Sequence, residues 1–430
     1  MPDEFNSPYK SYSSFGANPY FIDLPTLYES GLLTPDEFRG ALQDTPFLAE
    51  YSRLTKERIE LLSRAAMRVR DRGHVERFID EHPELSEAAK FLALKEKNGG
   101  IPWQEWTDDK PDADRLFVWQ FIQYEFFRQW QGVREYARLK GIKIIGDLPI
   151  YVALDSADVW AHRDEFQLDS EGYPLAVAGV PPDYFAKDGQ LWGNPLYDYD
   201  KMSRDGYSFW RRRISAALSL FDGVRLDHFR GIESYFSIPA TAKSAKEGHW
   251  VKGPGRELVD AIIDEAKGAP VIAEDLGDIT DEVRELLLYS GLLGMRVFQF
   301  GFLGDPVTPH LPHNYTENSV AYSGTHDNNT LLGYVWEMDG DSRRRVFDYC
   351  GAATEDFADG VRAIKRTLLA SHSSLVIFPI QDILGYGADT RMNTPGRAEG
   401  NWCYRITREQ LDSIDRHTLR EQNRLFGRVK

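Results

Sequence analysis

From residue 142 onward, short apolar runs alternate with longer segments whose apolar residues recur at helical spacing. Six runs have this character: IKIIGD, GVRLD, PVIAED, MRVFQF, SVAYSG and LVIFPI. Near-continuous apolar runs are typical of parallel strands that are buried on both faces. The separations between them leave room for a helix after each strand. The pattern therefore predicts an α/β fold built from repeated strand–helix units.

The first third of the chain has a different pattern. From about Thr34 to Lys140 it is mainly helical, and ADRLFVWQFIQYEFFRQWQGVREYARLKG is predicted to be one long helix that ends in basic residues and Gly141. Between the first two predicted strands, residues 152–209 are rich in Gly, Pro, Asp and Trp, which predicts a long, functional loop. We therefore divide the chain into four parts: an N-terminal loop region over 1–33, a mainly helical subdomain over 34–141, a strand–helix region over 142–400 with the 152–209 insertion, and a helical tail over 401–430 that packs on it.

Charge and composition exclude several classes of function. The 430 residues include 51 basic and 67 acidic side chains, a net charge of −16, which disfavours a nucleic-acid partner. The sequence has neither an apolar run of about 18 residues, as a membrane span requires, nor a secretory pattern at its start. Cys350 and Cys403 are the only cysteines, and neither stands in a zinc-binding pattern. We expect a cytoplasmic protein with no membrane partner, no metal and no cofactor.

Acidic residues stand at the ends of four of the predicted strands. Residues i and i+2 of a strand share a face, so Arg225 and Asp227 are expected to point the same way. Glu274, Asp327 and Asp147 each follow another predicted strand. In an eight-stranded barrel of parallel strands, the carboxyl ends of the strands converge on one mouth. The sequence therefore predicts four carboxylates in one cleft.

A single acid after a strand is more often a helix N-cap than a catalytic group, by about 4 to 1. Capping is therefore an alternative interpretation of Asp147. The combination favours a working site, because Arg225 would keep Asp227 ionised while burial and like charge would raise the pKa of Glu274. Two carboxyl groups about 5–5.5 Å apart with separated pKa values serve as nucleophile and general acid/base in retaining glycoside chemistry. This hypothesis makes Asp227 the nucleophile and Glu274 the acid/base, with Asp327 stabilising the oxocarbenium-like transition state.

Six segments carry a specific resemblance to a known family. In order, they are GDLPIYVALDSADVWAH, AGVPPDYFAKDGQLWGNPLY, GVRLDHFRG, VIAEDLG, SGTHDNNT and RMNTPGRAEGNW. Together they resemble the 4-α-glucanotransferases (amylomaltases or disproportionating enzymes) of the α-amylase clan, from about Ser7 to the C-terminus. The resemblance implies a (β/α)8 barrel with helical insertions. It gives Asp227, Glu274 and Asp327 the same three roles as the charge argument.

The resemblance also implies a set of substrate-binding residues. Arg225, His326 and Asp147 correspond to the family's ligands for the donor sugar. Gln190 and Trp192 correspond to a loop that meets the glucan, Tyr184 and Phe185 to aromatics on the acceptor side, and Asn393 to a lid-like loop. Ser7 and Tyr9, in the 1–33 region, correspond to polar contacts near the donor end. Packing is an equally good interpretation of Tyr9 and Trp192, and Asn393 also suits a turn.

The implied reaction moves a segment of an α-1,4-glucan from one maltooligosaccharide to another through a covalent intermediate, with maltooligosaccharides or glucans derived from starch or glycogen as partners. Two alternatives remain: a retaining α-glucan hydrolase on the same barrel, and a non-catalytic glucan-binding protein. The second alternative rests on the N-terminus. Members of the family begin with a strand, a helix and a strand before the SPY segment, and Met1 stands six residues before Ser7. We therefore expect this chain to lack that unit, and a misassigned start site is the explanation we favour.

Overall fold

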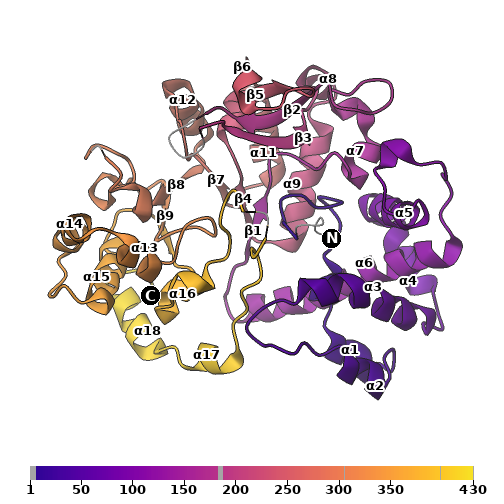
Figure 1. Ribbon diagram of the computed structural model, residues 1–430, viewed down its shortest axis with the longest axis horizontal. Helices are drawn as coiled ribbons and strands as arrows, with labels where there is room; N and C mark the ends of the chain where they lie inside the picture. The colour runs from indigo at the N-terminus through magenta and orange to yellow at the C-terminus, as the bar shows by residue number, and fades with distance from the viewer. Residues whose placement is uncertain (1–5, 183–186, 305, 398, 430) are drawn as a thin grey trace. The chain divides into compact units, whose positions relative to one another are not determined.

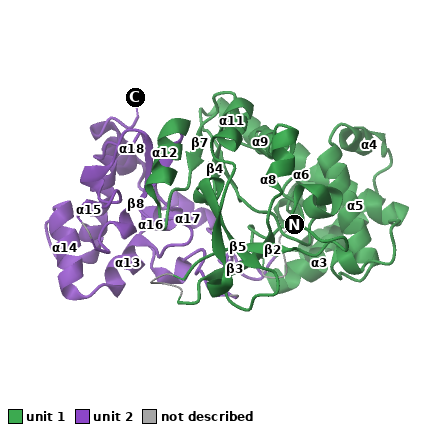
Figure 2. Ribbon diagram, turned by 90° about the horizontal axis from the view of Figure 1, so that it is seen from above, with its two compact units in different colours: residues 1–42, 51–290 green, residues 43–50, 291–430 purple. Residues whose placement is uncertain are grey.

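The structure is a computed structural model that describes residues 6–182, 187–304, 306–397 and 399–429 (Figure 1). Two compact units make up the chain. The first contains residues 1–42 and 51–290, and the second contains residues 43–50 and 291–430 (Figure 2). Among the described residues, no helix combines the length and the apolar character needed to cross a membrane.

All six predicted strands are confirmed. In the first unit, β1 (Ile145–Leu148), β4 (Gly223–Leu226) and β7 (Val271–Ala273) pair in that order, and both pairings are parallel. In the second unit, β8 (Leu293–Val297), β9 (Ser319–Tyr322) and β10 (Leu375–Ile377) pair in parallel as well. β7 and β9 are buried along their whole length and β4 and β8 along most of it, as strands covered on both faces should be. The two outer strands of this order differ, because β1 alternates exposed and buried residues and β10 is half-buried.

Phe221, which lies just before β4, packs closely against Gly146 of β1. A side chain at Gly146 would place its Cβ 2.1 Å from the Phe221 ring, so only glycine lets this ring lie against β1. Helix α9 (Ser208–Leu220) leads into β4 and packs on both β1 and β4. The strand ends that follow are therefore held by packing rather than by loop contacts alone.

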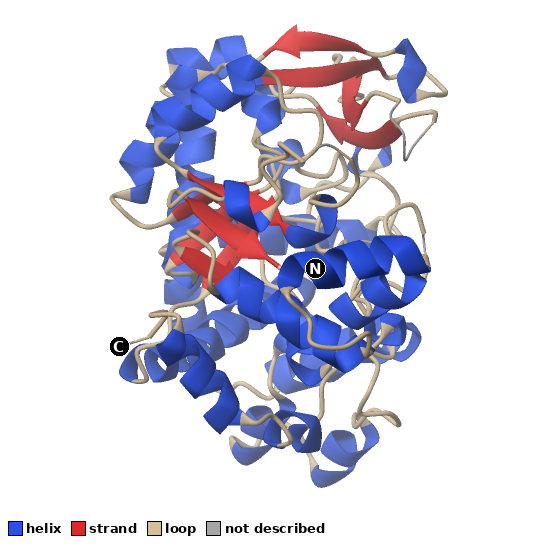
Figure 3. Cartoon of the chain, turned by 90° about the vertical axis from the view of Figure 1, so that its left-hand side faces the viewer, coloured by secondary structure: helices blue, strands red, loops and turns tan. Residues whose placement is uncertain are grey.

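The 152–209 segment is more ordered than the predicted loop. It contains β2 (Ala176–Val180) and β3 (Gln190–Pro195), with helix α7 (Ala157–Ala161) before them and α8 (Tyr199–Arg204) after them. These strands join β5 (Ser234–Pro239) and β6 (His249–Lys252) in an antiparallel sheet of order β3-β2-β5-β6, separate from the parallel strands (Figure 3). The sequence pattern missed this sheet because β2 pairs with β5, a strand far along the chain.

Helices make up the rest of the first unit. Before β1 they are α1 (Leu24–Glu29), α2 (Pro35–Gly40), α3 (Tyr51–Met67), α4 (Gly73–Asp80), α5 (Pro83–Lys97) and α6 (Ala113–Leu139). Later in the unit come α10 (Arg230–Glu233), α11 (Arg256–Ala266) and α12 (Asp281–Ser290). Helix α6 is the long helix that the sequence predicts. It ends before Gly141, whose φ of +68° takes the chain out of the helix.

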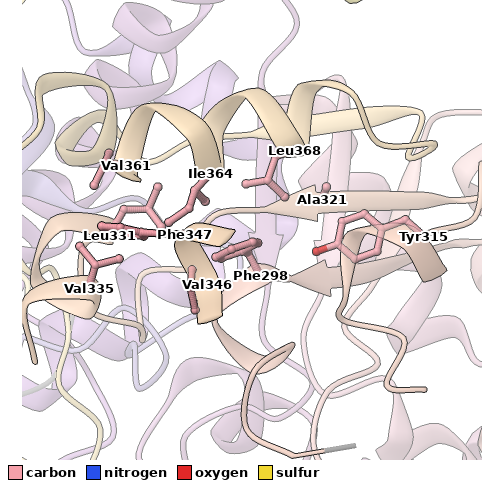
Figure 4. Packing of buried hydrophobic residues seen from close by; sticks show 10 residues of the cluster. All are labelled: Phe298, Tyr315, Ala321, Leu331, Val335, Val346, Phe347, Val361, Ile364 and Leu368. Carbon is pink, nitrogen blue, oxygen red and sulfur yellow. The ribbon is translucent and has the colours of Figure 1, made fainter. Parts of the chain in front are cut away.

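The second unit packs its helices around an apolar core. They are α13 (Leu331–Glu337), α14 (Gly340–Cys350), α15 (Phe357–Leu369), α16 (Ile380–Leu384), α17 (Arg408–Asp412) and α18 (Arg416–Leu425). Ten buried residues from α13, α14, α15, β9 and the turns before β9 form one cluster (Figure 4). Gly360 on α15 lies against the Phe347 ring of α14, where a Cβ would approach the ring to 2.1 Å. This core supports the loop that follows β9.

Candidate active site

Arg225 is the centre of a charged cluster at the carboxyl ends of β1 and β4. Asp147 and Arg225 are direct neighbours in the parallel register, so their side chains leave the same face of the strands. One nitrogen of Arg225, Nη1, lies 2.8 and 2.9 Å from the two carboxylate oxygens of Asp147 and 2.9 Å from Oδ1 of Asp227. Burial opposes the charge of the guanidinium, but Asp147 and Asp227 raise the pKa of Arg225 above its ordinary value. The arginine therefore stays charged and holds both carboxylates in place.

The N-terminal segment contributes Tyr9 to this cluster. Its hydroxyl donates a 2.5 Å hydrogen bond to Oδ2 of Asp147, and its backbone N–H donates to the Ser7 hydroxyl oxygen at 3.3 Å. Burial and the charges of Asp147 and Asp227 raise the pKa of Tyr9 above its ordinary value. The phenol therefore stays protonated and remains a donor to the carboxylate.

Two contacts fasten this N-terminal segment to α7. The carboxylate of Asp158, whose residue is 2% exposed, accepts hydrogen bonds from the backbone N–H of Ser14, at 2.8 Å, and from its hydroxyl. The N–H of Ala157 donates to the carbonyl of Tyr12 at 2.8 Å. The chain on either side of Tyr12 is thus held to a helix of the same unit, which fixes the direction from which Tyr9 approaches.

Glu274 follows β7 directly and is oriented by main-chain donors. The N–H of His228 donates to its Oε2 at 2.6 Å, and the N–H of Leu276 donates to Oε1 at 3.2 Å. Its own N–H continues the parallel ladder by donating to the carbonyl of Leu226 at 3.0 Å. Burial first, and then the charge of Asp227, raise the pKa of Glu274 to about 8. The direction of this pKa shift is the one that the sequence predicts.

His228 is a site residue that was not among the sequence-based candidates. It has a left-handed backbone, with φ of +49°, which turns its N–H toward Glu274. Its ring packs edge-to-face against Trp192, with 5.0 Å between centroids, and the indole N–H of Trp192 donates to the side-chain oxygen of Gln190 at 3.1 Å. Burial, with a contribution from Arg230, lowers the pKa of His228 to about 4. The available signal was the position of His228, directly after a charged strand end.

Asp327 lies in the second unit, in the loop after β9. Its Oδ1 accepts a 2.5 Å hydrogen bond from the side-chain amide of Asn393 and lies 3.4 Å from Nε2 of His326. Arg391 donates to the Asp327 carbonyl at 2.6 Å, and the Asn393 N–H donates to the His326 carbonyl at 3.0 Å. The RMNTPGR segment is therefore hydrogen-bonded directly to the loop that carries the third predicted carboxylate. Arg391 was not predicted.

A buried carboxylate braces the same loop at both ends. Asp382 on α16 is 1% exposed. Its Oδ2 accepts from the Ser323 hydroxyl at 2.6 Å, and its Oδ1 accepts from the N–H of Leu331, the first residue of α13, at 2.7 Å. Since Asp327 lies between these two anchor points, Asp382 limits where the loop can lie.

The structure brings the predicted residues together in two groups. In the first unit the group comprises Ser7, Tyr9, Asp147, Arg225, Asp227 and Glu274, with Trp192 and Gln190 joined to it through His228. In the second unit it comprises His326, Asp327 and Asn393. Tyr184 and Phe185 lie outside the described residues. A cleft that unites all four carboxylates stays a prediction.

The first group provides two carboxyl groups in different electrostatic environments. Asp227 is ion-paired to the half-buried Arg225, whereas burial and that same aspartate raise the pKa of Glu274 to about 8. A carboxylate can attack an electrophilic carbon, and a carboxylic acid beside it can protonate a leaving oxygen. This arrangement suits the cleavage of a glycosidic bond by a pair of carboxyl groups.

Comparisons with known proteins agree with this chemistry. A family model described as 4-alpha-glucanotransferase matches residues 1–411. A 4-alpha-glucanotransferase of Synechocystis is 40% identical over 98% of this chain and 88% of its own length, and that of Thermus thermophilus is 42% identical over 94% and 85%. An amylomaltase from Streptococcus agalactiae, solved in complex with acarbose, superposes with a TM-score of 0.93 at 33% identity, over 100% of this chain and 90% of its own.

Proposed function

We propose, since this chain belongs to the 4-alpha-glucanotransferase family, that it transfers segments of α-1,4-glucan between maltooligosaccharides by a retaining double displacement through Asp227 and Glu274. The observation that carries the proposal is the contrast between these two carboxyl groups. Asp227 is held by Arg225 at 2.9 Å, while burial and Asp227 raise the pKa of Glu274 to about 8.

In the first step, Asp227 attacks the anomeric carbon of the donor glucan. Because Glu274 is protonated at neutral pH, it gives its proton to the glycosidic oxygen, and the shortened chain leaves with a new 4-hydroxyl group. The bond from the anomeric carbon to the leaving oxygen is replaced by an ester bond to Asp227. Arg225 keeps the attacking oxygen in place, and Asp147 binds the donor sugar beside it.

In the second step, Glu274 acts as the base. Once Asp227 is esterified it carries no charge, so one of the causes that raise the pKa of Glu274 is removed. The carboxylate form then accepts the proton of the acceptor's 4-hydroxyl, whose oxygen attacks the ester-linked anomeric carbon. One α-1,4 bond is broken and one is made, so the reaction balances without a cofactor.

The remaining predicted residues have supporting roles in this proposal. Asp327, held by Asn393, stabilises the positive charge that develops on the sugar ring, and His326 binds the donor sugar. Tyr9 and Ser7 bind near the donor end. Trp192, with Gln190, lines the path of the glucan, and Tyr184 and Phe185 bind the acceptor and exclude water. Exclusion of water separates transfer from the alternative outcome, hydrolysis of the same intermediate.

The proposed partners are soluble maltooligosaccharides and longer α-1,4-glucans. The related amylomaltase was solved with acarbose, which supports a saccharide site. The proposal keeps the cytoplasm as the compartment, since both cysteines are free thiols.

Incubation with maltotriose tests the function directly. We expect glucose, maltotetraose, maltopentaose and longer products, because each transfer lengthens one chain at the expense of another. Chromatography of the reaction over time would show the ladder, and total reducing ends would stay constant. A steady rise in reducing ends without longer chains would indicate a hydrolase, and unchanged maltotriose would contradict catalysis.

Replacement of Asp382 by Asn should slow catalysis although this residue contacts no substrate. An Asn side chain has one accepting oxygen and no charge, so the Ser323 hydroxyl must reverse to accept from the amide and both anchoring hydrogen bonds become weaker neutral ones. The loop with Asp327 is then held less firmly. Loss of a buried hydrogen bond to a charged group is worth about 1.5–3 kcal/mol, and we expect kcat to fall about 10- to 100-fold. The KM for maltotriose should change little.

Ser323→Ala is the matched control, because it removes one of the two anchoring hydrogen bonds and leaves the other acceptor intact. Its kcat should fall less than that of Asp382→Asn. A variant of Asp382 that melts earlier yet keeps the parent kcat at low temperature would show that this carboxylate supports stability alone.

A further inference from the structure

The turns that follow β4 and β7 are joined by hydrogen bonds. Besides the N–H of His228, which donates to the Glu274 side chain, the N–H of Phe229 donates to the Glu274 carbonyl at 3.0 Å. The next residue, Arg230, begins α10, and its Nη1 donates to the main-chain carbonyl of Asp278. Three successive residues after the proposed nucleophile therefore contact the segment that carries the proposed acid/base, and Arg230 does so with its side chain.

The guanidinium of Arg230 rests on an aromatic ring. Its Cζ lies 3.9 Å from the ring centroid of Trp250 on β6, a distance at which the ring attracts a cation. The arginine is 5% exposed, so its side chain has little freedom to take another position. Arg230 therefore connects the antiparallel sheet, through Trp250, to the turn that follows β7.

Carboxylates have a minor part in holding this arginine. The side chain of Asp278 is 80% exposed, with its Oδ2 3.9 Å from Nη2 of Arg230, and Glu233 is paired to Lys252. Burial lowers the pKa of Arg230, and three acids nearby oppose this effect only in part; they are Asp278, Glu233 and Glu282. An apolar residue would avoid the penalty of burying a charge. The contact that distinguishes arginine here is therefore its hydrogen bond to the main-chain carbonyl.

The carbonyl that Arg230 holds belongs to the turn that orients Glu274. Leu276 of this turn donates its N–H to Oε1 of Glu274 at 3.2 Å. Gly277 follows with a φ of +88°, in the left-handed region that favours glycine, and Asp278 is the next residue. Because one residue separates the Leu276 N–H from the Asp278 carbonyl, a shift of the carbonyl also moves the N–H.

We propose that Arg230 is a positioning residue for the acid/base: by holding the Asp278 carbonyl, it keeps the Leu276 N–H aimed at Glu274. The inference rests on the proposed function in taking Glu274 as the acid/base. A donor to the charged form of a carboxyl group lowers its pKa. The turn that Arg230 holds therefore limits the rise in the pKa of Glu274 that burial and Asp227 cause.

Arg230→Met tests the proposal, because methionine can pack on the Trp250 ring but cannot donate to the carbonyl. We expect kcat for maltotriose to fall about 10- to 100-fold, as loss of a hydrogen bond from a charged group predicts. Arg230→Lys keeps the charge and a donor, so its kcat should lie between those of Arg230→Met and the parent. Arg256→Met is the matched control. This exposed arginine on α11 also lies on an aromatic ring, 4.3 Å from the centroid of Tyr289, and its loss should leave kcat unchanged.

Two further measurements separate positioning from a general structural effect. With α-maltosyl fluoride as donor, departure needs no proton, so fluoride release in the first turnover by Arg230→Met should stay within about threefold of the parent. The pH above which kcat/KM for maltotriose falls should rise by about one unit, because the charged form of Glu274 loses a main-chain donor. The other charges that act on Glu274 stay in place in this variant; they are those of Asp227, Arg225 and Asp275.

A folded Arg230→Met with the kcat and the pH profile of the parent would overturn the proposal. An equal loss with maltotriose and α-maltosyl fluoride would overturn it as well. Should Arg230→Met fail to fold, Arg230→Lys and Trp250→Leu, which removes the ring but keeps the arginine, are judged by the same two criteria. The proposed function fails by a different result, the absence of a maltotriose ladder from the parent chain, so the two failures are distinguishable.

Discussion

Asp227→Asn is expected to lower kcat for glucan transfer by at least about four orders of magnitude, as loss of a covalent nucleophile typically does. The amide cannot form the ester intermediate, and Arg225 loses one of the two carboxylates that it holds. Initial rates of the maltotriose ladder would measure the loss. Because Asn is nearly the same size, the melting temperature should stay close to that of the parent.

A chemical rescue shows whether Asp227 is the nucleophile rather than a structural residue. With Asp227→Ala and α-maltosyl fluoride as donor, azide should enter the vacated space, form a carbon–nitrogen bond as the carbon–fluorine bond breaks, and give the β-azide. The parent chain should give no β-azide under the same conditions. If azide restores no product to a folded variant, the assignment of the nucleophile is wrong.

Glu274→Gln should reduce kcat for maltotriose by about 10²- to 10⁴-fold, the usual contribution of general acid–base catalysis. The effect should depend on the leaving group. With α-maltosyl fluoride as donor, departure needs no proton, so formation of the intermediate should be nearly as fast as in the parent. A loss of equal size with both donors would contradict the assignment of Glu274 as acid.

The pKa of Glu274 sets the expected pH dependence. Since the acid form is needed in the free enzyme, kcat/KM should fall as pH rises through about 8. The same shift affects stability: the folded pKa lies above the ordinary value of 4.5, so between these two pH values the folded chain binds more protons than the unfolded chain. The free energy of unfolding should therefore fall as pH rises through this window.

Glu274→Gln should remove this dependence. Its melting temperature should rise relative to that of the parent as pH increases through this window, because the amide does not ionise. A constant loss at all pH values is superimposed, because the amide NH2 group faces one of the two N–H donors of His228 and Leu276. Differential scanning calorimetry of the parent and the variant across this pH range measures the two melting temperatures. Such a gain in stability with a loss of activity would mean that the chain retains a destabilising carboxyl group for its chemistry.

The fold was predictable where its signal is local. The six parallel strands are short apolar runs, and α6 is one uninterrupted helical pattern that ends at Gly141. The antiparallel sheet was not predictable in this way. The segment AVAGV has partners at 190–195 and 234–239, and its strand character depends on those distant pairings.

The candidate site was likewise predictable only where its residues follow a local pattern in the sequence. The alternation of side chains along a strand predicted that Arg225 and Asp227 share a face, and the structure places both beside Asp147. The pKa direction of Glu274 followed from burial and like charge. The roles of Asp382 and of the His228 backbone did not follow, because a carboxylate that accepts from the start of a helix 51 residues away leaves no local pattern.

The left-handed turn at His228 has a consequence for the evolution of this family. The group that orients Glu274 there is a main-chain N–H, which every residue except proline possesses. The imidazole can therefore be replaced without loss of that contact, provided that the new residue tolerates a φ of +49°. Glycine and asparagine tolerate this φ readily, whereas valine and isoleucine do not. Part of the proposed catalytic site is thus set by the shape of the backbone, and related chains could keep this contact while their side chains at this position differ.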